Sequence, residues 1–348
     1  MKIAFTCIDL PGETKGGASY SVHYLANQLI LAGHEVTIFT LSPKPKDALY
    51  NINLIHVPFF IKNIYGLSST LFPFLAAFKN FDSFDILHFH GDNQYIFTKT
   101  PVIRTYYGSA LDEAINATTV TRFMQQLFFV YPNEIISGLK ADEKVVISRG
   151  VKKRYPFHTR VVYCGVDLDI FNPGQKNITP AILYVGGSIK GRKRGNLLIK
   201  LFKEQIKKKI KNAELWVVCK EKVSGIGIKC FSSNLSAQAI AALYRKAWVL
   251  CLPSKYEGLG LAYIEAMASG CAIVSSKNSG AQEILDNGRC GLIVEDNSIS
   301  AAIIRLIENE QERAHYEKLG AERAKNFSKE KALNQYQEIY EKLHQRHA

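Results

Sequence analysis

Short apolar runs alternate with longer amphipathic stretches along almost the whole chain. The short runs are rich in Val, Ile and Phe and have the length of buried strands, whereas the stretches 18–32, 235–246 and 279–286 carry apolar residues at helical spacing. The expected strands are 3–8, 36–41, 54–57, 86–89, 102–106, 145–147, 181–185, 215–219, 227–231, 248–253, 272–275 and 291–294. Strands that alternate with helices are typical of βαβ units in parallel sheets.

The pattern repeats once along the chain. An apolar run, a glycine pair and a helix occur at Gly16-Gly17 and recur at Gly186-Gly187. We therefore expect two doubly wound, Rossmann-like α/β domains, with the junction among the turn residues of 164–174. The expected domains are 1–165 and 166–326, and the last helix, about 327–348, is expected to pack back on the first domain. Ligands of such sheets bind beyond the carboxyl ends of the strands, so an interdomain cleft is the expected site.

Composition narrows the class of protein. With 348 residues, 47% hydrophobic and 22% charged, the chain has the material for two globular cores. The amino-terminal residues alternate too strongly for a secretory signal, and no run of 18 apolar residues predicts a membrane-spanning helix. Seven cysteines without a C-x-x-C spacing fit a reducing compartment. A cytoplasmic protein is expected, and contact with the inner face of the membrane stays open.

The net charge of +13 is concentrated in one segment. Residues 190–229 contain 13 Lys or Arg against three Glu. The positive electrostatic field of such a segment attracts phosphates, nucleic acid or an anionic membrane surface. The lysines of 197–211 also fit the solvated face of a helix, since the apolar residues there form one stripe. A basic nucleic-acid-binding protein is the alternative that this segment alone supports.

The loop 185–195 (V-G-G-S-I-K-G-R-K-R-G) has the composition of an anion-binding turn. Two glycines let the backbone approach an anion, several cations are near, and a helix begins after them. An ATP-binding P-loop requires Gly-Lys-Ser/Thr, and no hydroxyl follows Arg192-Lys193, which argues against an ATPase. Arg194 or Lys193 is a candidate to neutralise a diphosphate.

Two carboxylates surround a second glycine-rich turn. Glu257 lies in the turn that follows the buried strand 248–253, and Glu265 lies in the helix that opens near Leu261. Ionised carboxylates accept hydrogen bonds from sugar hydroxyls, and the free N–H groups at the helix start favour an anion. A glycosidase also uses two carboxylates, but it needs neither the glycine turn nor the nearby cations.

At this point the sequence resembles retaining glycosyltransferases of family 4, which have the GT-B fold. Glu257 and Glu265 match the family's E-x7-E signature, and Gly16-Gly17 resembles its first glycine-rich loop. Residues 161–173 resemble its linker, with Cys164 in place of Asn, and residues 182–199 resemble its diphosphate loop. The short element Ser279–Glu283 resembles the G-x-x-E motif that follows the next strand. The resemblance covers most of the chain and is strongest between Cys164 and Val294.

The resemblance implies roles for these positions in binding a nucleotide sugar. Glu265 would bind ribose hydroxyls, and Glu257 would bind the donor sugar. The backbone N–H groups of Gly258, Leu259, Gly260 and Leu261 would face sugar and phosphate, as would Gly17 from the other domain. The family's usual Arg is replaced by Gly187, so the diphosphate would rest on Arg192, Lys193 or Arg194, with Arg194 favoured first and Lys193 second.

The first domain would bind the acceptor. Tyr107 stands where the family often has a His that contacts the donor sugar. His90 and Asp92 follow a strand and are candidates for acceptor contact, with a structural role and a metal site as alternatives. The aromatic segments 58–84 and 123–131 suit either core packing or a lipid-linked acceptor at a membrane; the first includes Phe59, Phe60, Leu71, Phe72 and Phe74.

The expected reaction is retaining transfer of a hexose from a UDP-, GDP- or ADP-linked donor to a hydroxyl of a glycan or a lipid-linked acceptor. The expected setting is cell-surface polysaccharide, lipopolysaccharide or related glycan assembly. No cofactor and no metal are expected, because no D-x-D cluster is present and the basic loop can replace a divalent ion. The alternatives are a sugar-nucleotide epimerase or phosphorylase of the same fold, an inactive sugar-nucleotide binder, and a nucleic-acid-binding protein.

Overall fold

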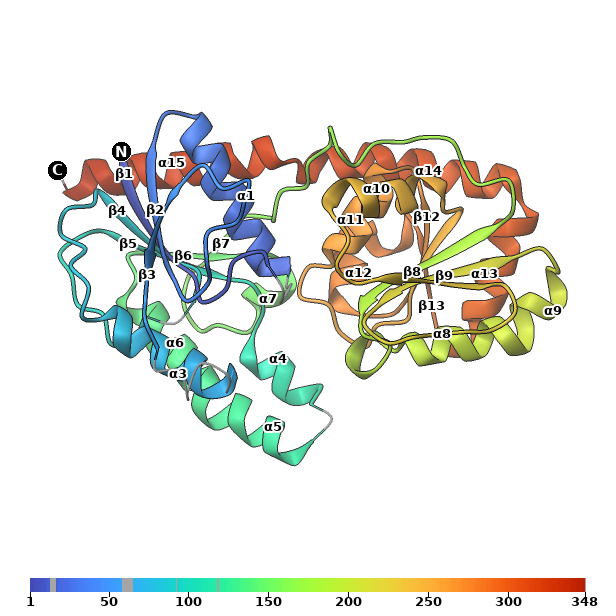
Figure 1. Cartoon of the computed structure of the whole chain (residues 1–348), viewed down its shortest axis with the longest axis horizontal. Coiled ribbons are helices and arrows are strands. Elements are labelled where there is room, and N and C mark those ends of the chain that lie inside the picture. Colours follow the sequence, from blue (N-terminus) through green and yellow to red (C-terminus); the bar gives the residue numbers. More distant parts are fainter. Residues whose placement is uncertain (13–16, 58–64, 92, 118, 348) are drawn as a thin grey trace. The chain divides into compact units, whose positions relative to one another are not determined.

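A computed structural model describes residues 1–12, 17–57, 65–91, 93–117 and 119–347 (Figure 1). Two compact units divide the chain. Unit 1 comprises Met1–Gly165 together with Lys329–Ala348, and unit 2 comprises Val166–Ser328. Each unit is a parallel sheet with helices packed around it, so the prediction of two parallel-sheet α/β domains is confirmed.

Among its described residues, unit 1 contains a seven-stranded parallel sheet in the order β3-β2-β1-β4-β5-β6-β7. The order reverses direction beside β1, which is the mark of a doubly wound sheet. The strands are β1 (Lys2–Thr6), β2 (Glu35–Thr40), β3 (Asn51–Leu54), β4 (Ile86–Phe89), β5 (Val102–Tyr106), β6 (Glu143–Val146) and β7 (Arg160–Val161).

Helices connect these strands and cover the sheet of unit 1. The long α15 packs along α1, and its tyrosines reach the sheet, where Tyr340 Oη lies 2.7 Å from His88 Nδ1 on β4. The helical elements are α1 (Gly17–Leu31), α3 (Tyr65–Ala76), α4 (Ala110–Ile115), α5 (Val120–Gln125), the π-helical turn η1 (Gln126–Val130), α6 (Tyr131–Lys140), α7 (Arg149–Lys152) and α15 (Lys329–His347).

Unit 2 has a six-stranded parallel sheet in the order β10-β9-β8-β11-β12-β13. Its strands are β8 (Ala181–Gly187), β9 (Glu214–Cys219), β10 (Ile228–Ser232), β11 (Val249–Leu252), β12 (Ala272–Ser276) and β13 (Leu292–Val294). Its longer helices are α8 (Gly195–Leu201), α10 (Ala237–Lys246), α11 (Leu261–Ala268), α12 (Ser279–Ile284), α13 (Ile299–Glu308) and α14 (Glu310–Ala324). The short turns η2 (Gly191–Lys193), η3 (Phe202–Ile206), α9 (Lys207–Lys209), η4 (Asp286–Gly288), η5 (Asp296–Ser298) and η6 (Lys325–Phe327) complete the unit.

Most strands lie within a residue or two of their predicted positions, and β4 and β5 have the predicted bounds. The third strand is an exception. It spans Asn51–Leu54 rather than 54–57, because the polar sequence N-I-N-L forms a partly exposed edge strand that the apolar pattern does not reveal. The two-residue β7 also has no apolar signature. No helix among the described residues is long and apolar enough to cross a membrane.

Candidate nucleotide-sugar site

Two strand–turn–helix connections lie side by side at the carboxyl edge of the sheet of unit 2. The first runs from β8 through the basic loop to α8, and the second runs from β11 through residues 253–260 to α11. Because β8 and β11 are neighbouring parallel strands, both turns emerge at the same edge. The backbone joins them directly, since Lys255 N donates to Arg192 O at 2.9 Å. The edge where open α/β sheets bind ligands therefore carries both predicted motifs.

The second turn is shaped by two glycines. Gly260 has φ of +88°, a left-handed conformation that favours glycine, and it directly precedes α11. Gly280 at the start of α12 touches the turn from the other side. A Cβ at Gly280 would lie 2.8 Å from Glu257 Cβ and 2.9 Å from Leu259 O. The G-x-x-E element thus has a steric role here, since only glycine lets α12 approach the turn that carries Glu257.

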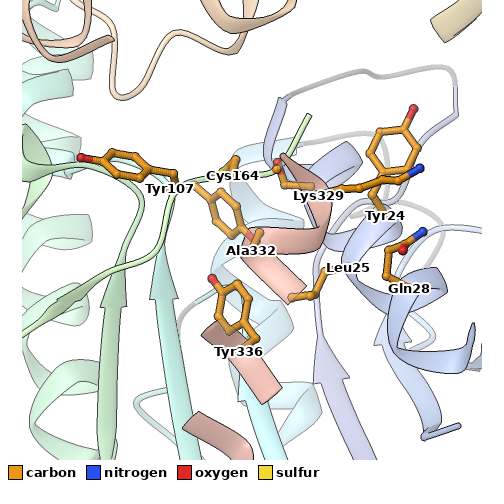
Figure 2. Close-up of a pocket in the computed structure, with 11 residues that line it drawn as sticks. Tyr24, Leu25, Gln28, Tyr107, Cys164, Lys329, Ala332 and Tyr336 are labelled. Carbon is orange, nitrogen blue, oxygen red and sulfur yellow. The ribbon is translucent and has the colours of Figure 1, made fainter. Parts of the chain in front are cut away.

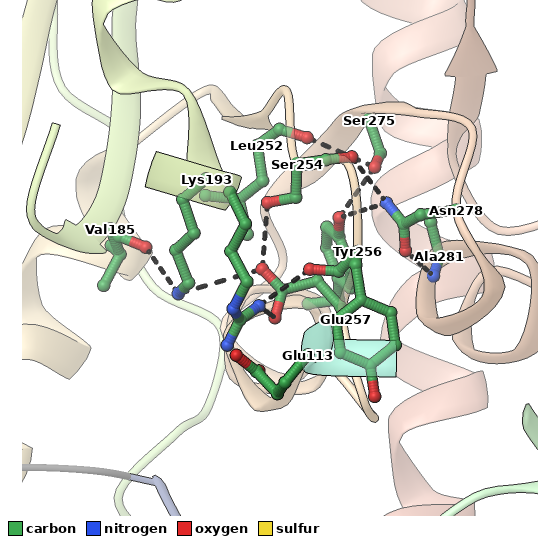
Figure 3. A network of polar contacts seen from close by, with 12 residues as sticks. Glu113, Val185, Lys193, Leu252, Ser254, Tyr256, Glu257, Ser275, Asn278 and Ala281 are labelled. Atoms are coloured by element: carbon green, nitrogen blue, oxygen red, sulfur yellow. Dashed lines mark hydrogen bonds and ion pairs between the residues drawn. The ribbon is translucent and has the colours of Figure 1, made fainter. Parts of the chain in front are cut away.

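Glu257 is the centre of a buried polar network in that turn (Figure 3). Its side chain is 7% exposed, and its carboxylate accepts from Arg192 Nη1 at 3.0 Å and from Ser254 Oγ at 2.9 Å. The Lys193 ammonium lies 3.9 Å from the same carboxylate. Burial raises the pKa of Glu257, but the charges of Lys193 and Arg192 and the two hydrogen bonds outweigh it and hold the pKa below its ordinary value. Glu257 is therefore ionised at neutral pH.

Lys193 and Arg192 are both directed toward the glycine-rich turns. Lys193 Nζ donates to Val185 O at 3.2 Å, at the end of β8, as Figure 3 shows. Arg192 Nη1 donates to Tyr256 O at 2.7 Å as well as to Glu257. About a third of the Arg192 side chain and a quarter of the Lys193 side chain remain exposed. These two cations and one carboxylate form a compact charged group at the sheet edge.

Arg194 has a different set of partners. Its guanidinium forms a two-pronged ion pair with Asp296, at 2.5 and 2.7 Å, and also donates to Pro253 O and Ser276 Oγ. Its backbone is left-handed, with φ of +50°, at the start of α8. A bidentate pair of this kind fixes a guanidinium firmly. Arg194, the cation that the sequence favoured first, is thus held by protein groups and connects the basic loop to β12 and η5.

Glu221 supports the basic loop and was not singled out in the sequence. Its carboxylate accepts from Ser188 Oγ at 2.5 Å and from Ile189 N at 3.2 Å. The hydrogen bond from Ser188 lowers the pKa of Glu221. Next to these residues, Gly187 has φ of +67° and stays partly exposed, with no atom near the position of a Cβ. The hydrogen bonds to Glu221 therefore fix the loop directly after Gly187, the position where the resemblance expects an Arg.

Asn278 is a second supporting residue that sequence reasoning missed. Its side chain caps α12 by accepting from Ala281 N at 2.9 Å, and its amide donates to Ser254 O at 3.2 Å. Tyr263 completes this group, because its hydroxyl accepts from the Asn278 amide at 3.4 Å and lies 2.7 Å from Ser275 Oγ. An Asn directly before a helix is a recognisable N-cap signal, so the cap itself was available from the sequence. Its second contact, with the turn of Glu257, depends on the fold.

Glu265 lies on α11, one turn beyond the helix start, and is half-buried. Its carboxylate accepts from Tyr244 Oη of α10 at 2.9 Å. Burial raises the pKa of Glu265, although Tyr244 and the charge of Lys193 partly offset the effect. Tyr244 contacts one oxygen of the carboxylate, and the other oxygen is the one available to a ligand hydroxyl.

In unit 1, His90 and Tyr107 lie together at the ends of β4 and β5. His90 Nδ1 is 2.9 Å from Tyr107 Oη, and burial together with the neighbouring His88 and Arg104 lowers the pKa of His90 well below its ordinary value. Both residues line a pocket of about 240 Å³. Within the described part of the chain, the buried His90 Nε2 has no hydrogen-bond partner. A neutral imidazole nitrogen is thus left for a ligand.

Tyr107 also lines a smaller cavity in unit 1. It has a volume of about 30 Å³, enough to hold an ordered water, and is lined by α1, α15 and the segment around Cys164 (Figure 2). Tyr336 of α15 and Tyr24 of α1 also line it. Tyr107 therefore lines both the pocket of His90 and the cavity beside α15.

Only part of the predicted site in unit 1 lies within the described residues. Gly17 is the first residue of α1 and is exposed, so its N–H lies at a helix start. Gly16 and Asp92 lie outside the described residues, as do Phe59 and Phe60. Within the described chain, no group of three or more His, Cys, Asp or Glu is arranged to hold a metal ion.

Comparison with known proteins identifies the family. A family model described as "Glycosyltransferase Family 4" matches residues 15–170, and one described as "Glycosyl transferases group 1" matches residues 167–323. The chain is 25% identical to an MMP α-(1→4)-mannosyltransferase from Mycolicibacterium hassiacum, over 94% of this chain and 95% of that protein.

Solved structures share the fold. A sucrose-phosphate synthase from Thermosynechococcus elongatus superimposes with a TM-score of 0.76 at 22% identity, over 98% of each chain. The Anabaena protein HepE, solved in complex with UDP and glucose, gives a TM-score of 0.72 at 15% identity, over 97% of this chain and 99% of that one. The two family models match consecutive parts of the chain, and the solved structures match its full length with the GT-B fold. The chain therefore belongs to the family 4 type of glycosyltransferases and has the GT-B fold.

Proposed function

We propose that this glycosyltransferase moves a hexose from a nucleoside diphosphate to an acceptor hydroxyl with retention of the anomeric configuration. The observation that carries the proposal is the charged group of Glu257, Arg192 and Lys193 at the edge of the unit 2 sheet. Breaking a sugar–diphosphate bond builds negative charge on the leaving group and positive charge on the sugar. Preorganised cations stabilise the first, and a nearby carboxylate binds and stabilises the second.

Within this group we assign the diphosphate to Lys193 and Arg192 ahead of Arg194. The Arg194 guanidinium is already paired with Asp296. Lys193 instead lies near the end of β8, where no atom lies near the position of a Cβ on Gly187 and the backbone is open to a ligand. The N–H groups of Gly258, Leu259, Gly260 and Leu261, at the start of α11, add a partial positive charge on the opposite side. Arg194 then acts as a positioning residue that fixes the loop.

Glu265 is assigned to the nucleotide ribose. One of its oxygens is held by Tyr244, which orients the carboxylate and leaves the other oxygen for vicinal hydroxyls. Glu257 is assigned to the donor sugar, because Ser254 and Arg192 fix both of its oxygens close to the diphosphate cations. The HepE complex with UDP and glucose and the mannosyl activity in the name of the relative support a hexose on a nucleoside diphosphate as the donor.

The acceptor is assigned to the pocket of His90 and Tyr107 in unit 1, and Gly17 at the start of α1 is assigned to phosphate binding. The pocket volume of about 240 Å³ and the neutral His90 Nε2 suit a hydroxyl-bearing acceptor. No side chain is assigned as a covalent nucleophile. The leaving phosphate is the proposed base for the acceptor proton, in a same-face displacement that uses no metal and no cofactor. Assembly of a cell-surface glycan stays a prediction from the resemblance.

The test begins with donor binding. Binding of UDP, GDP and ADP is measured by thermal shift and calorimetry, and each diphosphate is compared with its monophosphate. One diphosphate should bind more tightly than the other two and more tightly than its own monophosphate. Transfer from the matching hexose donor, followed by NMR, should then give a product with the donor's anomeric configuration, in the presence of EDTA. An inverted product would refute the retaining mechanism, a requirement for manganese would refute the metal-free part, and failure of all three diphosphates to bind would refute the proposal.

A further inference from the structure

Two cysteines of unit 2 share one hydrogen-bond acceptor at the carboxyl end of β9. Cys219 Sγ donates to the backbone oxygen of Glu221 at 3.0 Å, and Cys230 Sγ donates to the same oxygen at 3.4 Å. Because both sulfur atoms lie within hydrogen-bond reach of a single oxygen, the two thiols are close neighbours. They are separated by 11 positions in the sequence, so no C-x-x-C spacing announces them.

The register of the sheet explains why these thiols meet. Cys230 of β10 is paired with Val217 of β9, two residues before Cys219. Side chains two residues apart on a strand project from the same face, so both cysteines lie on one face of the sheet. The strand order of unit 2, which is described throughout, places β10 at the edge with β9 as its neighbour. An edge strand is paired on one side and can adjust toward its partner more easily than a central strand.

Cys230 differs from the other cysteines in its exposure. All seven cysteines lie within the described residues, and six are buried, whereas Cys230 is exposed. Burial raises the pKa of the Cys219 thiol to about 12, and the adjacent Cys230 adds to this effect. Packing as a small hydrophobe accounts for a buried thiol but not for an exposed one. The pair therefore combines one thiol that an oxidant can reach with a protected thiol beside it.

The acceptor that the thiols share belongs to the residue that holds the basic loop. The Glu221 carboxylate accepts from Ser188 Oγ and from Ile189 N. Lys220, the preceding residue, donates its N–H to Gly187 O at 2.9 Å. The end of β9 thus reaches the first residues of the basic loop through three hydrogen bonds. A change at the thiols is expected to pass to this loop.

The pair is suited to a disulfide rather than to a metal ion. Structural sites for thiolate-bound metals use four ligands, and catalytic ones use three protein ligands. No group of three or more His, Cys, Asp or Glu in the described parts of the chain is arranged in this way. A disulfide needs two adjacent thiols and nothing else from the protein.

We propose that Cys219 and Cys230 form a reversible redox switch, which hydrogen peroxide closes into a disulfide and which then releases the basic loop from Glu221. Cys230 Sγ attacks one peroxide oxygen, so an S–O bond forms, the O–O bond breaks and one water leaves. Cys219 Sγ then attacks the resulting sulfenic sulfur, so the S–S bond forms and a second water leaves. The two thiols together lose two electrons and two protons, and the peroxide is reduced to two waters. A dithiol reductant reverses the step by exchange.

Closing the disulfide consumes both S–H donors. The backbone oxygen of Glu221 then loses the two hydrogen bonds that fix it, and the carboxylate no longer has a fixed position from which to hold Ser188 and Ile189. The basic loop becomes less ordered beside Gly187, and affinity for a diphosphate falls. This loss of affinity rests on the proposed function, whereas the disulfide and the release of the loop do not.

The first experiment detects the disulfide. The full chain is treated with hydrogen peroxide, alkylated in denaturant and mapped by peptide mass spectrometry. We expect a cross-link between Cys219 and Cys230 that dithiothreitol removes. Cys230→Ser should abolish the cross-link and keep the fold, because its hydroxyl can still donate to Glu221 O. The matched control is Cys290→Ser, at a buried cysteine of the same unit, which should form the cross-link like the wild type.

The second experiment measures the release of the loop by hydrogen exchange of residues 185–195. Exchange should be faster in the oxidised wild type, up to about tenfold for an amide that loses one hydrogen bond. Peroxide should leave the exchange of Cys230→Ser unchanged, and Glu221→Ala should show the faster exchange without peroxide. The nucleoside diphosphate that binds most tightly of UDP, GDP and ADP should bind more weakly after oxidation and recover with dithiothreitol.

Two results would overturn the proposal. The first is that peroxide leaves both thiols open to alkylation, or converts Cys230 to a sulfinic acid while Cys219 stays a thiol. The second is a cross-linked chain in which residues 185–195 exchange as slowly as in the reduced chain. Neither measurement uses a nucleotide. Failure here is therefore distinct from failure of the proposed function, in which the reduced chain binds none of the three diphosphates.

Discussion

Arg192 Nη1 lies 3.0 Å from Glu257 Oε2, so the basic loop and the E-x7-E turn meet in a single ion pair. The two residues are 65 positions apart, on the connections that follow β8 and β11. Arg192 helps to set the charge state of Glu257, since the charges of Lys193 and Arg192 and the hydrogen bonds to the carboxylate outweigh its burial and hold its pKa low. A substitution in either loop should therefore also alter this ion pair.

Replacement of Glu257 by Gln should abolish most turnover while leaving nucleotide binding largely intact. The neutral amide keeps the shape but removes the negative charge beside the developing positive charge of the sugar. We expect kcat to fall about 100-fold or more, with little change in the Kd of the nucleoside diphosphate. Glu308→Gln, on the exposed end of α13, is the control and should retain wild-type kcat. A Glu257→Gln enzyme with normal kcat would remove this residue from the reaction.

The three cations of the basic loop should differ in their contribution to nucleoside-diphosphate binding. Lys193→Ala and Arg192→Ala should each weaken nucleoside-diphosphate binding about tenfold, with a much smaller effect on the monophosphate, because the charge acts on the second phosphate. Arg194→Ala should instead lower Tm, because it breaks the pair with Asp296 that fixes the loop. Calorimetry and thermal unfolding of the three variants measure both effects. A larger loss of diphosphate affinity in Arg194→Ala than in Lys193→Ala would restore the order expected from the sequence.

Donor binding should depend on pH through Glu265. Burial raises the pKa of this carboxyl, and only the ionised form accepts hydrogen bonds from both ribose hydroxyls. Nucleotide affinity should therefore fall as the pH is lowered, with a midpoint above the ordinary Glu value of about 4.3. The same raised pKa means that Glu265 contributes stability at low pH that is lost as the pH rises through the folded-state pKa.

Two variants test this assignment. Tyr244→Phe removes a hydrogen bond that lowers the pKa of Glu265, so the midpoint of nucleotide binding should move to higher pH. Glu265→Gln should bind the nucleotide weakly and without this pH dependence. A titration in which the Glu265→Gln curve keeps the wild-type midpoint would show that another group controls binding.

Tyr107→Phe should impair use of the acceptor and leave donor affinity unchanged. The variant removes the hydroxyl that lies 2.9 Å from His90 Nδ1 and with it the constraint on the imidazole tautomer. We expect a higher KM for the acceptor, an unchanged Kd for the nucleoside diphosphate, and a shifted ring-nitrogen NMR signal for His90. Tyr95→Phe, at a tyrosine that is 46% exposed, is the matched control. An unchanged acceptor KM would indicate that the pair is structural.

Gly280→Ala should destabilise unit 2 and disturb Glu257 at the same time. The added methyl group would lie 2.8 Å from Glu257 O and 2.9 Å from Leu259 O, and backbone atoms cannot move away cheaply. Overpacking of this kind costs about 1–3 kcal/mol. Denaturant unfolding gives the free energy, and Ser279→Ala, at the exposed neighbouring position, should change it by less than about 0.5 kcal/mol. Equal stability of the two variants would mean that α12 can shift.

The fold could be predicted largely from periodicity, because buried parallel strands are continuous apolar runs. β4 and β5 carry such runs and were located to the residue, whereas β3 alternates Asn with apolar residues at a partly exposed edge and was misplaced. The E-x7-E turn was visible because its glycines and carboxylates are close in sequence. The local sequence does not show which partners Arg192, Lys193 and Arg194 contact.

The orientation of the basic loop depended on residues distant in sequence. Arg194 pairs with Asp296, which is 102 positions away and belongs to no motif. Ser188 and Glu221 are joined across two strand connections in the same way. These partners become neighbours only when the sheet has assembled, so the sequence pattern identified three candidate cations but could not separate their roles.

The contact of His88 with Tyr340 joins residues 252 positions apart within one sheet-and-helix core. A ribosome therefore produces β1 to β7 long before the helix that seals their core, and unit 2 is synthesised in between. During that interval the sheet of unit 1 exposes the apolar surface that Tyr336, Ile339 and Leu343 later cover. Contacts this distant fold late, so the emerging chain should be most vulnerable to aggregation, and most dependent on chaperones, until residues 329–347 leave the ribosome.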